Sequence, residues 1–146
     1  MNHKLYKWLT IDMVAFVILN AIVLYFFNDA LVSLKDITLF TLLILGLAAY
    51  RSANILSNEV VTKPLRAPFV TEVTEDGVVV EKPKKKGFLG AFGFLIYCPS
   101  CTGVWLSAAL IYSYALWPTP TFVVALFLSL SAIERIVARS LAFIKK

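Results

Sequence analysis

The stretch ITLFTLLILGLAAYRSANIL (37–56) contains a single charged residue, Arg51. A helix of about 20 mostly apolar residues is long enough to cross the hydrocarbon core of a bilayer. Three further segments have a similar character, and they lie at 9–27, 98–117 and 121–144. The chain is 60% hydrophobic and only 16% charged, whereas about a quarter of the residues of a soluble domain are charged. The sequence therefore predicts an all-α integral membrane protein with four transmembrane helices.

The basic residues indicate how these helices are oriented. If both termini lie in the cytoplasm, every one of the 14 Lys and Arg residues except Lys35 falls on the cytoplasmic side. This distribution is the one that the positive-inside rule requires. We therefore expect a multi-pass membrane protein with both termini in the cytoplasm and the lipid bilayer as its main partner. Nucleic-acid binding needs a basic soluble face, which the sequence lacks, so we expect no nucleic-acid partner.

The region 58–87 is the only sizeable polar part of the chain, and it lies between the second and third predicted spans. Pro64, near its start, favours an extended path after the helix. Further on, alternating valine and polar residues flank Asp76-Gly77, which is a strong signal for a two-residue hairpin turn. We predict a small cytoplasmic β-hairpin that pairs Val70–Thr74 with Val78–Lys82. A lone hairpin is only marginally stable in water, so we expect it to rest on the membrane, on a second copy or on a partner.

A basic run follows the hairpin and consists of Lys84, Lys85 and Lys86. We predict that this run and Arg66 contact anionic lipid head groups or an acidic partner. Alternatively, the run is a solvated linker that only orients the chain. The apolar segment 88–97 is too short to span a bilayer, which favours an interfacial or re-entrant helix. The chain thus divides into a transmembrane hairpin (1–57), a cytoplasmic loop with the β-hairpin (58–87), and an interfacial segment with a second transmembrane hairpin (88–146).

The only two cysteines lie in IYCPSCTGVW (96–105), at the start of the third predicted span. Proline is favoured at the first position of a helix, because the N–H group that it lacks would have no partner there. We therefore expect Cys98 to cap this helix, Pro99 to be its first residue and Cys101 its third. Both sulfur atoms would then lie at the positive end of the helix dipole, where a thiolate is stabilised.

Three interpretations of the cysteine pair remain open. Zinc takes four ligands in structural sites, so two copies of the chain would be needed to build a four-thiolate site shared across a dimer. A Cys-x-x-Cys pair at a helix start is also typical of thiol–disulfide exchange, although the sequence has no second pair to relay electrons. In the third interpretation the thiols simply pack with Thr102 and Gly103 where two helices cross.

Ionisable side chains inside a bilayer are costly unless they are paired. Arg51 lies in the second predicted span and Glu134 in the fourth, at a similar depth. We therefore predict an intramembrane ion pair between Arg51 and Glu134. Asn20 lies in the middle of the first span and is expected to bond to a neighbouring helix. We interpret these as assembly contacts, and no catalytic motif such as H-E-x-x-H or G-x-S-x-G is present.

The order of these features resembles the bacterial and phage membrane proteins of domain-of-unknown-function family 1360, which include the Bacillus sporulation protein YjcA. The family pattern is an arginine on a span, an acidic residue, Pro-x-Arg, an acidic loop and Cys-x-x-Cys-Thr-Gly-x-Trp. Residues that fit it here are Arg51, Glu59, Pro64, Arg66, the TEVTEDG loop, Cys98, Cys101, Thr102, Gly103 and Trp105. Glu59 replaces an aspartate of the pattern, and the span at 9–27 is additional. Because the family has no established activity, the resemblance implies a bacterial inner-membrane location rather than a reaction.

These observations together favour a non-enzymatic protein with a structural or regulatory role, which the resemblance links to sporulation or envelope remodelling. The Cys-x-x-Cys turn would organise its cytoplasmic face, and a second copy or another membrane protein would be its partner. One alternative is a membrane thiol–disulfide oxidoreductase that uses Cys98 and Cys101. The other is a phage holin-like protein, which is also small, crosses the membrane several times and has a basic tail.

Overall fold

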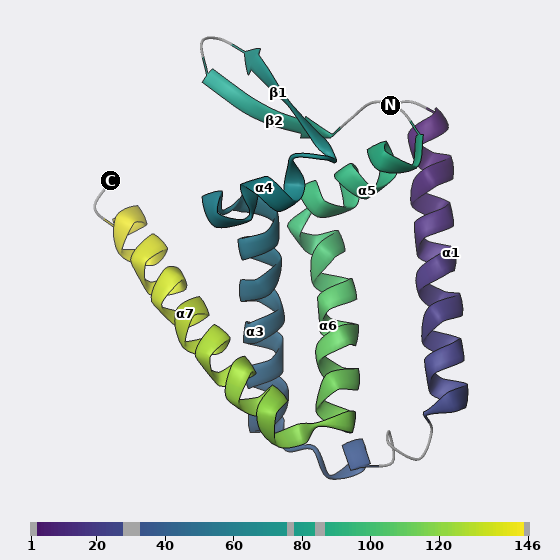
Figure 1. Ribbon diagram of the computed structural model, residues 1–146. Coiled ribbons are helices and arrows are strands. Elements are labelled where there is room, and N and C mark those ends of the chain that lie inside the picture. Colours follow the sequence, from purple (N-terminus) through teal and green to yellow (C-terminus); the bar gives the residue numbers. More distant parts are fainter. Residues whose placement is uncertain (1–2, 28–32, 76–77, 84–86, 145–146) are drawn as a thin grey trace.

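The computed structural model describes residues 3–27, 33–75, 78–83 and 87–144. Its long helices extend along the molecule, and the last of them leans away from the others towards its C-terminal end (Figure 1). They are α1 (His3–Phe26), α3 (Leu39–Asn58), α6 (Pro99–Leu116) and α7 (Pro118–Ile144). The shorter elements are η1 (Ser33–Asp36), η2 (Val60–Thr62), α4 (Lys63–Arg66), strands β1 (Val70–Glu75) and β2 (Val78–Pro83), and helix α5 (Gly87–Tyr97). The predicted fold class, mostly helical with one small hairpin, is confirmed at this level.

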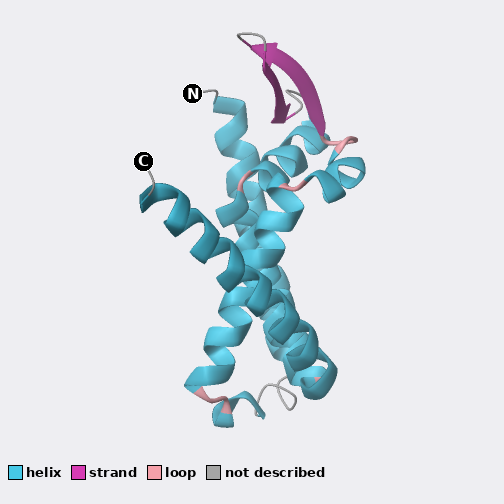
Figure 2. Cartoon of the chain, turned by 90° about the vertical axis from the view of Figure 1, so that its left-hand side faces the viewer, coloured by secondary structure: helices cyan, strands magenta, loops and turns pink. Residues whose placement is uncertain are grey.

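The short elements gather at one end of the helix bundle. We call α4, β1, β2 and α5 together the cap. Figure 1 shows the cap at the same end as the first turn of α1 and the last turn of α7, while η1 and the α6–α7 turn lie at the opposite end. In Figure 2 the hairpin stands beyond the ends of the helices. The structure thus separates a polar end that carries the cap from a long apolar body.

The start and end of α3 follow from local side-chain chemistry. Thr38 caps its N-terminus, and the Thr38 hydroxyl accepts the backbone N–H of Thr41 at 3.2 Å. The helix ends at Asn58 because Glu59 adopts an extended backbone conformation. The predicted extended path through Pro64 is wrong, since η2 and the one-turn helix α4 follow instead. Proline is compatible with the first turn of a helix, where no backbone N–H is needed, and Pro64 occupies such a position.

The core lies where α3, α6 and α7 meet. Its centre is made of Ile44, Leu45 and Ala48 from α3 with Ala125 from α7, and Leu110 of α6 packs against it. The contact between α3 and α7 uses small residues, because Ala48, Ala125, Ser129 and Ala132 are all completely buried. Small side chains let two helix backbones approach closely, which is the usual mode of helix packing in membranes.

The predicted hairpin forms. β1 and β2 are antiparallel, and Val73 pairs with Val80. The strands extend one residue beyond the predicted ends, to Glu75 and Pro83. The turn residues 76–77 lie outside the described part of the chain.

Helix α5 is held against the start of the hairpin by a close backbone approach. A Cβ atom on Gly93 would collide with the carbonyl oxygen of Phe69, which is backbone and cannot rotate away. The rings of Phe69 and Phe92 lie 5.6 Å apart beside this approach. From the other side, the hydroxyl of Thr102 in α6 donates to the carbonyl of Leu95 at 2.7 Å. Glycine at position 93 therefore allows α5 to pack closely against the start of the hairpin.

By length and apolar composition, two of the described helices are able to cross a membrane, namely α3 and α7. The prediction of four spans is therefore not supported by this criterion. The apolar part of α1 is shorter, Thr10–Phe26. In α6 (PSCTGVWLSAALIYSYAL) the Ser, Thr and Tyr residues dilute the aliphatic ones. Only 33% of the apolar window of α3 and 17% of that of α7 is buried inside the molecule, so these helices leave most of their apolar surface uncovered.

Candidate functional site

The cysteine turn (residues 98–101) has the predicted local geometry. Cys98 caps the N-terminus of α6 with an extended backbone, and Pro99 stands in the first turn. The Cys98 sulfur accepts the backbone N–H of Cys101 at 3.4 Å and the thiol of Cys101 at 2.8 Å. The two sulfurs are not bonded to each other. Because Cys98 is the acceptor in both contacts, any negative charge on the pair is best stabilised on its sulfur.

The cysteine turn offers two sulfur ligands, both half-buried. Among the described residues no group of three or more His, Cys, Asp or Glu side chains could hold a metal ion. A structural zinc site needs four ligands. The chain alone therefore supplies half of such a site from its described part, and the other ligands would come from a second copy or a partner.

The residues that follow the cysteines hold α6 against its neighbours. Thr102 is buried and bonds to α5, as described above. A Cβ atom on Gly103 would stand 3.8 Å from that of Ala53, so Gly103 marks the place where α3 passes α6. The ring of Trp105 meets that of Phe16 of α1 edge to face, with centroids 4.8 Å apart. The sequence from Cys98 to Trp105 thus joins α6 to α5, α3 and α1 in turn.

The prediction that Asn20 bonds to another helix is confirmed. Its side-chain oxygen accepts the hydroxyl of Tyr112 from α6, and its amide group donates to the carbonyl of Phe16 at 2.7 Å. Together with the Phe16–Trp105 contact, this hydrogen bond attaches α1 to α6 at two levels.

A charged cluster lies at the cap end of the bundle, and we call Glu59, Arg51 and Arg135 the Glu59 cluster. One carboxylate oxygen of Glu59 accepts hydrogen bonds from both arginines. Arg51 also donates from its Nε to the hydroxyl of Ser131 at 2.8 Å. The three side chains are 12–25% exposed. Glu59 therefore ties the end of α3 to α7, and the cluster keeps one positive charge in excess.

The predicted pair of Arg51 with Glu134 is wrong. Arg51 pairs with Glu59, which stands just past the end of the same helix, and α7 presents Arg135 rather than Glu134 to the cluster. Neighbouring residues of a helix point about 100° apart, and the side chain of Glu134 is exposed. The prediction used only the depth of each residue along its helix, and depth does not show that Glu134 points away from Arg51 while Arg135 points towards Glu59.

Arg66 does not lie where the lipid-contact prediction requires. Its side chain is buried, and its exposed fraction is 5%. The guanidinium donates to the carbonyl oxygens of Leu56 at 3.1 Å and Glu59 at 2.9 Å, and to the hydroxyl of Thr62 at 3.0 Å. Arg66 therefore donates hydrogen bonds to carbonyl oxygens at the C-terminal end of α3, which have no partner within the helix. The other residues of that prediction, Lys84, Lys85 and Lys86, lie outside the described part of the chain.

The chain matches a known protein family. The model of the family described as protein of unknown function (DUF1360) matches residues 44–141, about two thirds of the chain. The chain belongs to this family. The match spans α3 to α7 and so contains the Glu59 cluster and the cysteine turn, whereas α1 lies outside it. Neither a curated protein nor a solved structure matches.

Sequence reasoning found the members of the DUF1360 pattern but not their connections. In the sequence Glu59 stands out only as an acidic residue after an arginine, yet it is the centre of the cluster. The spacing of eight residues between Arg51 and Glu59, close to two helical turns, was the available signal. Arg135 carried no such signal, because its contact with Glu59 joins residues 76 positions apart.

Proposed function

We propose that this DUF1360 protein is a multi-pass protein of the bacterial cytoplasmic membrane with a structural or regulatory role. In this proposal α1, α3, α6 and α7 all traverse the bilayer, and both termini and the cap lie in the cytoplasm. Helix α6 runs alongside α3, and α1 runs roughly parallel to α6 on the other side of it (Figure 1), which supports the inclusion of α1 and α6 as spans. The family resemblance is what links such a role to sporulation or envelope remodelling.

The orientation is supported by where charge falls on the structure. Arg51, Arg66, Arg135 and Arg139 all lie in the half of the bundle nearer the cap, and Lys35 lies in η1 at the other end. This is the asymmetry that the positive-inside rule expects if the cap is cytoplasmic. The uncovered apolar surface of α3 and α7 supports contact with lipid, because a soluble bundle would bury these faces.

The main support for a structural role is that the buried polar groups at the cap end bind to neighbouring elements of the fold. Glu59, Arg66 and Thr102 all join one element to another at the cap end, and none of them lines the pocket between α3 and α6. The outcome is a rigid base from which the hairpin projects beyond the helices (Figure 2). An exposed two-stranded hairpin offers free strand edges to a partner strand. We therefore propose that the bundle anchors the hairpin and presents it at the membrane surface.

The topology is tested with single cysteines in a background that carries Cys98→Ser and Cys101→Ser. Lys35→Cys and Thr74→Cys place one thiol at each end of the molecule. In intact cells, a membrane-impermeant maleimide should label the first variant and should label the second only after permeabilisation. Labelling of both in intact cells, or release of the protein by alkaline carbonate, would contradict the proposed topology.

A second candidate function is thiol–disulfide exchange, which the 2.8 Å approach of the two sulfurs favours. Oxidation of the pair would release two protons and two electrons to a thiol-oxidising partner and would close the Cys98–Cys101 bond. Equilibration in glutathione buffers distinguishes the two functions. A redox role predicts cycling at a potential between about −300 and −120 mV, with normal stability in Cys98→Ser. A structural role predicts a lower unfolding temperature in that variant and no cycling in this range.

A further inference from the structure

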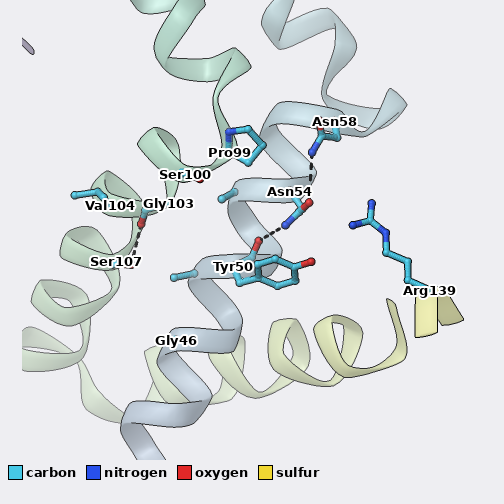
Figure 3. A pocket seen from close by; sticks show the side chains of 12 residues that line it. Gly46, Tyr50, Asn54, Asn58, Pro99, Ser100, Gly103, Val104, Ser107 and Arg139 are labelled. Carbon is cyan, nitrogen blue, oxygen red and sulfur yellow. Dashed lines mark hydrogen bonds between the residues drawn. The ribbon is translucent and has the colours of Figure 1, made fainter. Parts of the chain in front are cut away.

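We propose that the groove between α3 and α6 binds one anionic phospholipid, with its phosphate beside Arg139 and an acyl chain along the floor. The inference rests on the proposed membrane-spanning topology. Figure 3 shows the groove with its lining side chains. It has a volume of about 570 Å³ and is lined by residues of α3, α6 and α7. Cavities of about 300–1,000 Å³ are typical of small-molecule sites.

The lining of the groove changes character along its length. Its floor is formed by residues with little or no side chain, and it runs from Gly46 and Ala49 near the middle of α3 to Ala53 and Gly103 nearer the cap. A Cβ atom added to Gly46 would meet nothing within 4 Å, so this end is open space. An extended hydrocarbon chain fits such a floor, because small residues leave room for it. Tyr50 and Ser107 also line this part of the groove, and the Ser107 hydroxyl already donates to the Gly103 carbonyl at 2.8 Å.

Polar groups lie at the end of the groove nearer the cap. Asn58 and Ser100 line it there, and the Asn58 amide donates to the Asn54 side-chain oxygen at 3.3 Å. In Figure 3 the Arg139 side chain extends from α7 towards the level of Asn54 and Asn58. This end therefore offers hydroxyl, amide and guanidinium groups at the depth where a lipid phosphate lies.

The charge of the groove selects the class of ligand. Its lining contains Arg139 and neither Asp nor Glu. Unlike Arg51 and Arg135, which bind Glu59, Arg139 has no ion-pair or hydrogen-bond partner in the described part of the chain. Arginine binds phosphate through charge-assisted hydrogen bonds. A partner with negative charge at one end and an apolar chain at the other matches this lining, which describes an anionic phospholipid.

The test measures lipid retention by native mass spectrometry of the full chain in detergent, with phosphatidylglycerol or phosphatidylcholine added. We expect one phosphatidylglycerol per chain and clearly weaker binding of phosphatidylcholine. Arg139→Gln should weaken phosphatidylglycerol binding about tenfold, since it removes a charge-assisted hydrogen bond. Gly46→Leu should weaken both lipids by filling the apolar end, whereas Gly46→Ala should have little effect. Lys35→Gln, which removes one positive charge at the opposite end of the bundle, is the matched control.

Two further measurements test whether the groove instead holds a soluble phosphate compound or a second copy of the chain. Glycerol phosphate, which has the phosphate but no acyl chain, should compete only weakly, and strong competition by it would replace the lipid with a soluble phosphate ligand. A dimer that Gly46→Leu abolishes and Arg139→Gln leaves intact would assign the groove to a second copy of the chain. Equal binding of both lipids to all variants would overturn the proposal. Resistance to carbonate extraction tests the membrane topology separately. If the protein resists extraction, each of these results would contradict the lipid site but not the proposed membrane function.

Discussion

The Glu59 cluster gives the sharpest prediction for stability. Glu59→Gln keeps the size and shape of the side chain but removes its charge. In the structure the Glu59 carboxylate accepts hydrogen bonds from Arg51 and Arg135, and it links the end of α3 to α7 across 76 positions of sequence. The variant leaves two arginines together without a counter-charge. We therefore expect α7 to loosen at the cap end while the core around Ala48 and Ala125 stays packed.

The magnitude follows from the two lost charged contacts. A hydrogen bond to a charged group contributes about 1.5–3 kcal/mol, and Glu59 takes part in two of them. Glutamine retains a neutral acceptor, and the Glu59 side chain is 24% exposed, so water replaces part of the loss. We expect the free energy of unfolding to fall by about 2–3 kcal/mol. This corresponds to a melting temperature lower by about 5–10 °C.

The assay is thermal unfolding of the detergent-solubilised protein, followed by circular dichroism. Glu134→Gln is the matched control, because it removes the same charge from an exposed residue of α7. We expect this control to change stability by less than about 0.5 kcal/mol. Wild-type stability in Glu59→Gln, or an equal loss in Glu134→Gln, would refute the assignment of Glu59 as the counter-charge. Arg51→Gln combined with Glu59→Gln should cost less than the sum of the two single changes.

Three other predictions concern the cap, the first helix and the cysteine turn. Gly93→Ala should destabilise the protein by about 1–3 kcal/mol, because the added Cβ meets the Phe69 carbonyl, whereas Gly103→Ala has room and should be neutral or stabilising in the same melt. Equal effects of the two changes would show that the close approach of α5 is absent in solution. Tyr112→Phe removes the hydrogen bond to α1 and should speed hydrogen exchange in α1 about fivefold, with α3 unchanged. Unaltered exchange in α1 would mean that this contact does not hold the helix. Protein purified under reducing, anaerobic conditions should contain about half a zinc ion per chain, lost in Cys98→Ser, if two copies share a four-thiolate site. Two freely titrating thiols without metal would exclude that site.

The hairpin and the helix cap could be predicted from the sequence, because each depends on residues that are close together in the chain. Asp76-Gly77 between alternating valines predicts the hairpin, and the structure has antiparallel strands on either side of these residues. Pro99 after Cys98 predicts the helix cap, and the structure has it. Where two local rules compete, prediction fails, as at Pro64, which both breaks a long helix and starts a short one.

The sequence by itself determined the helical class, the hairpin, the cysteine turn and the charge asymmetry, since all of these depend on composition or on short-range spacing. Only the tertiary structure decided which charges meet. Arg51 takes Glu59 and not Glu134, because the rotation of α7 about its axis turns Arg135 towards α3. In the same way, the burial of Arg66 and the groove beside Arg139 depend on how separate helices pack. Hydropathy fixes the depth of a residue in a helix, but the direction in which its side chain points is set by packing against the neighbouring helices.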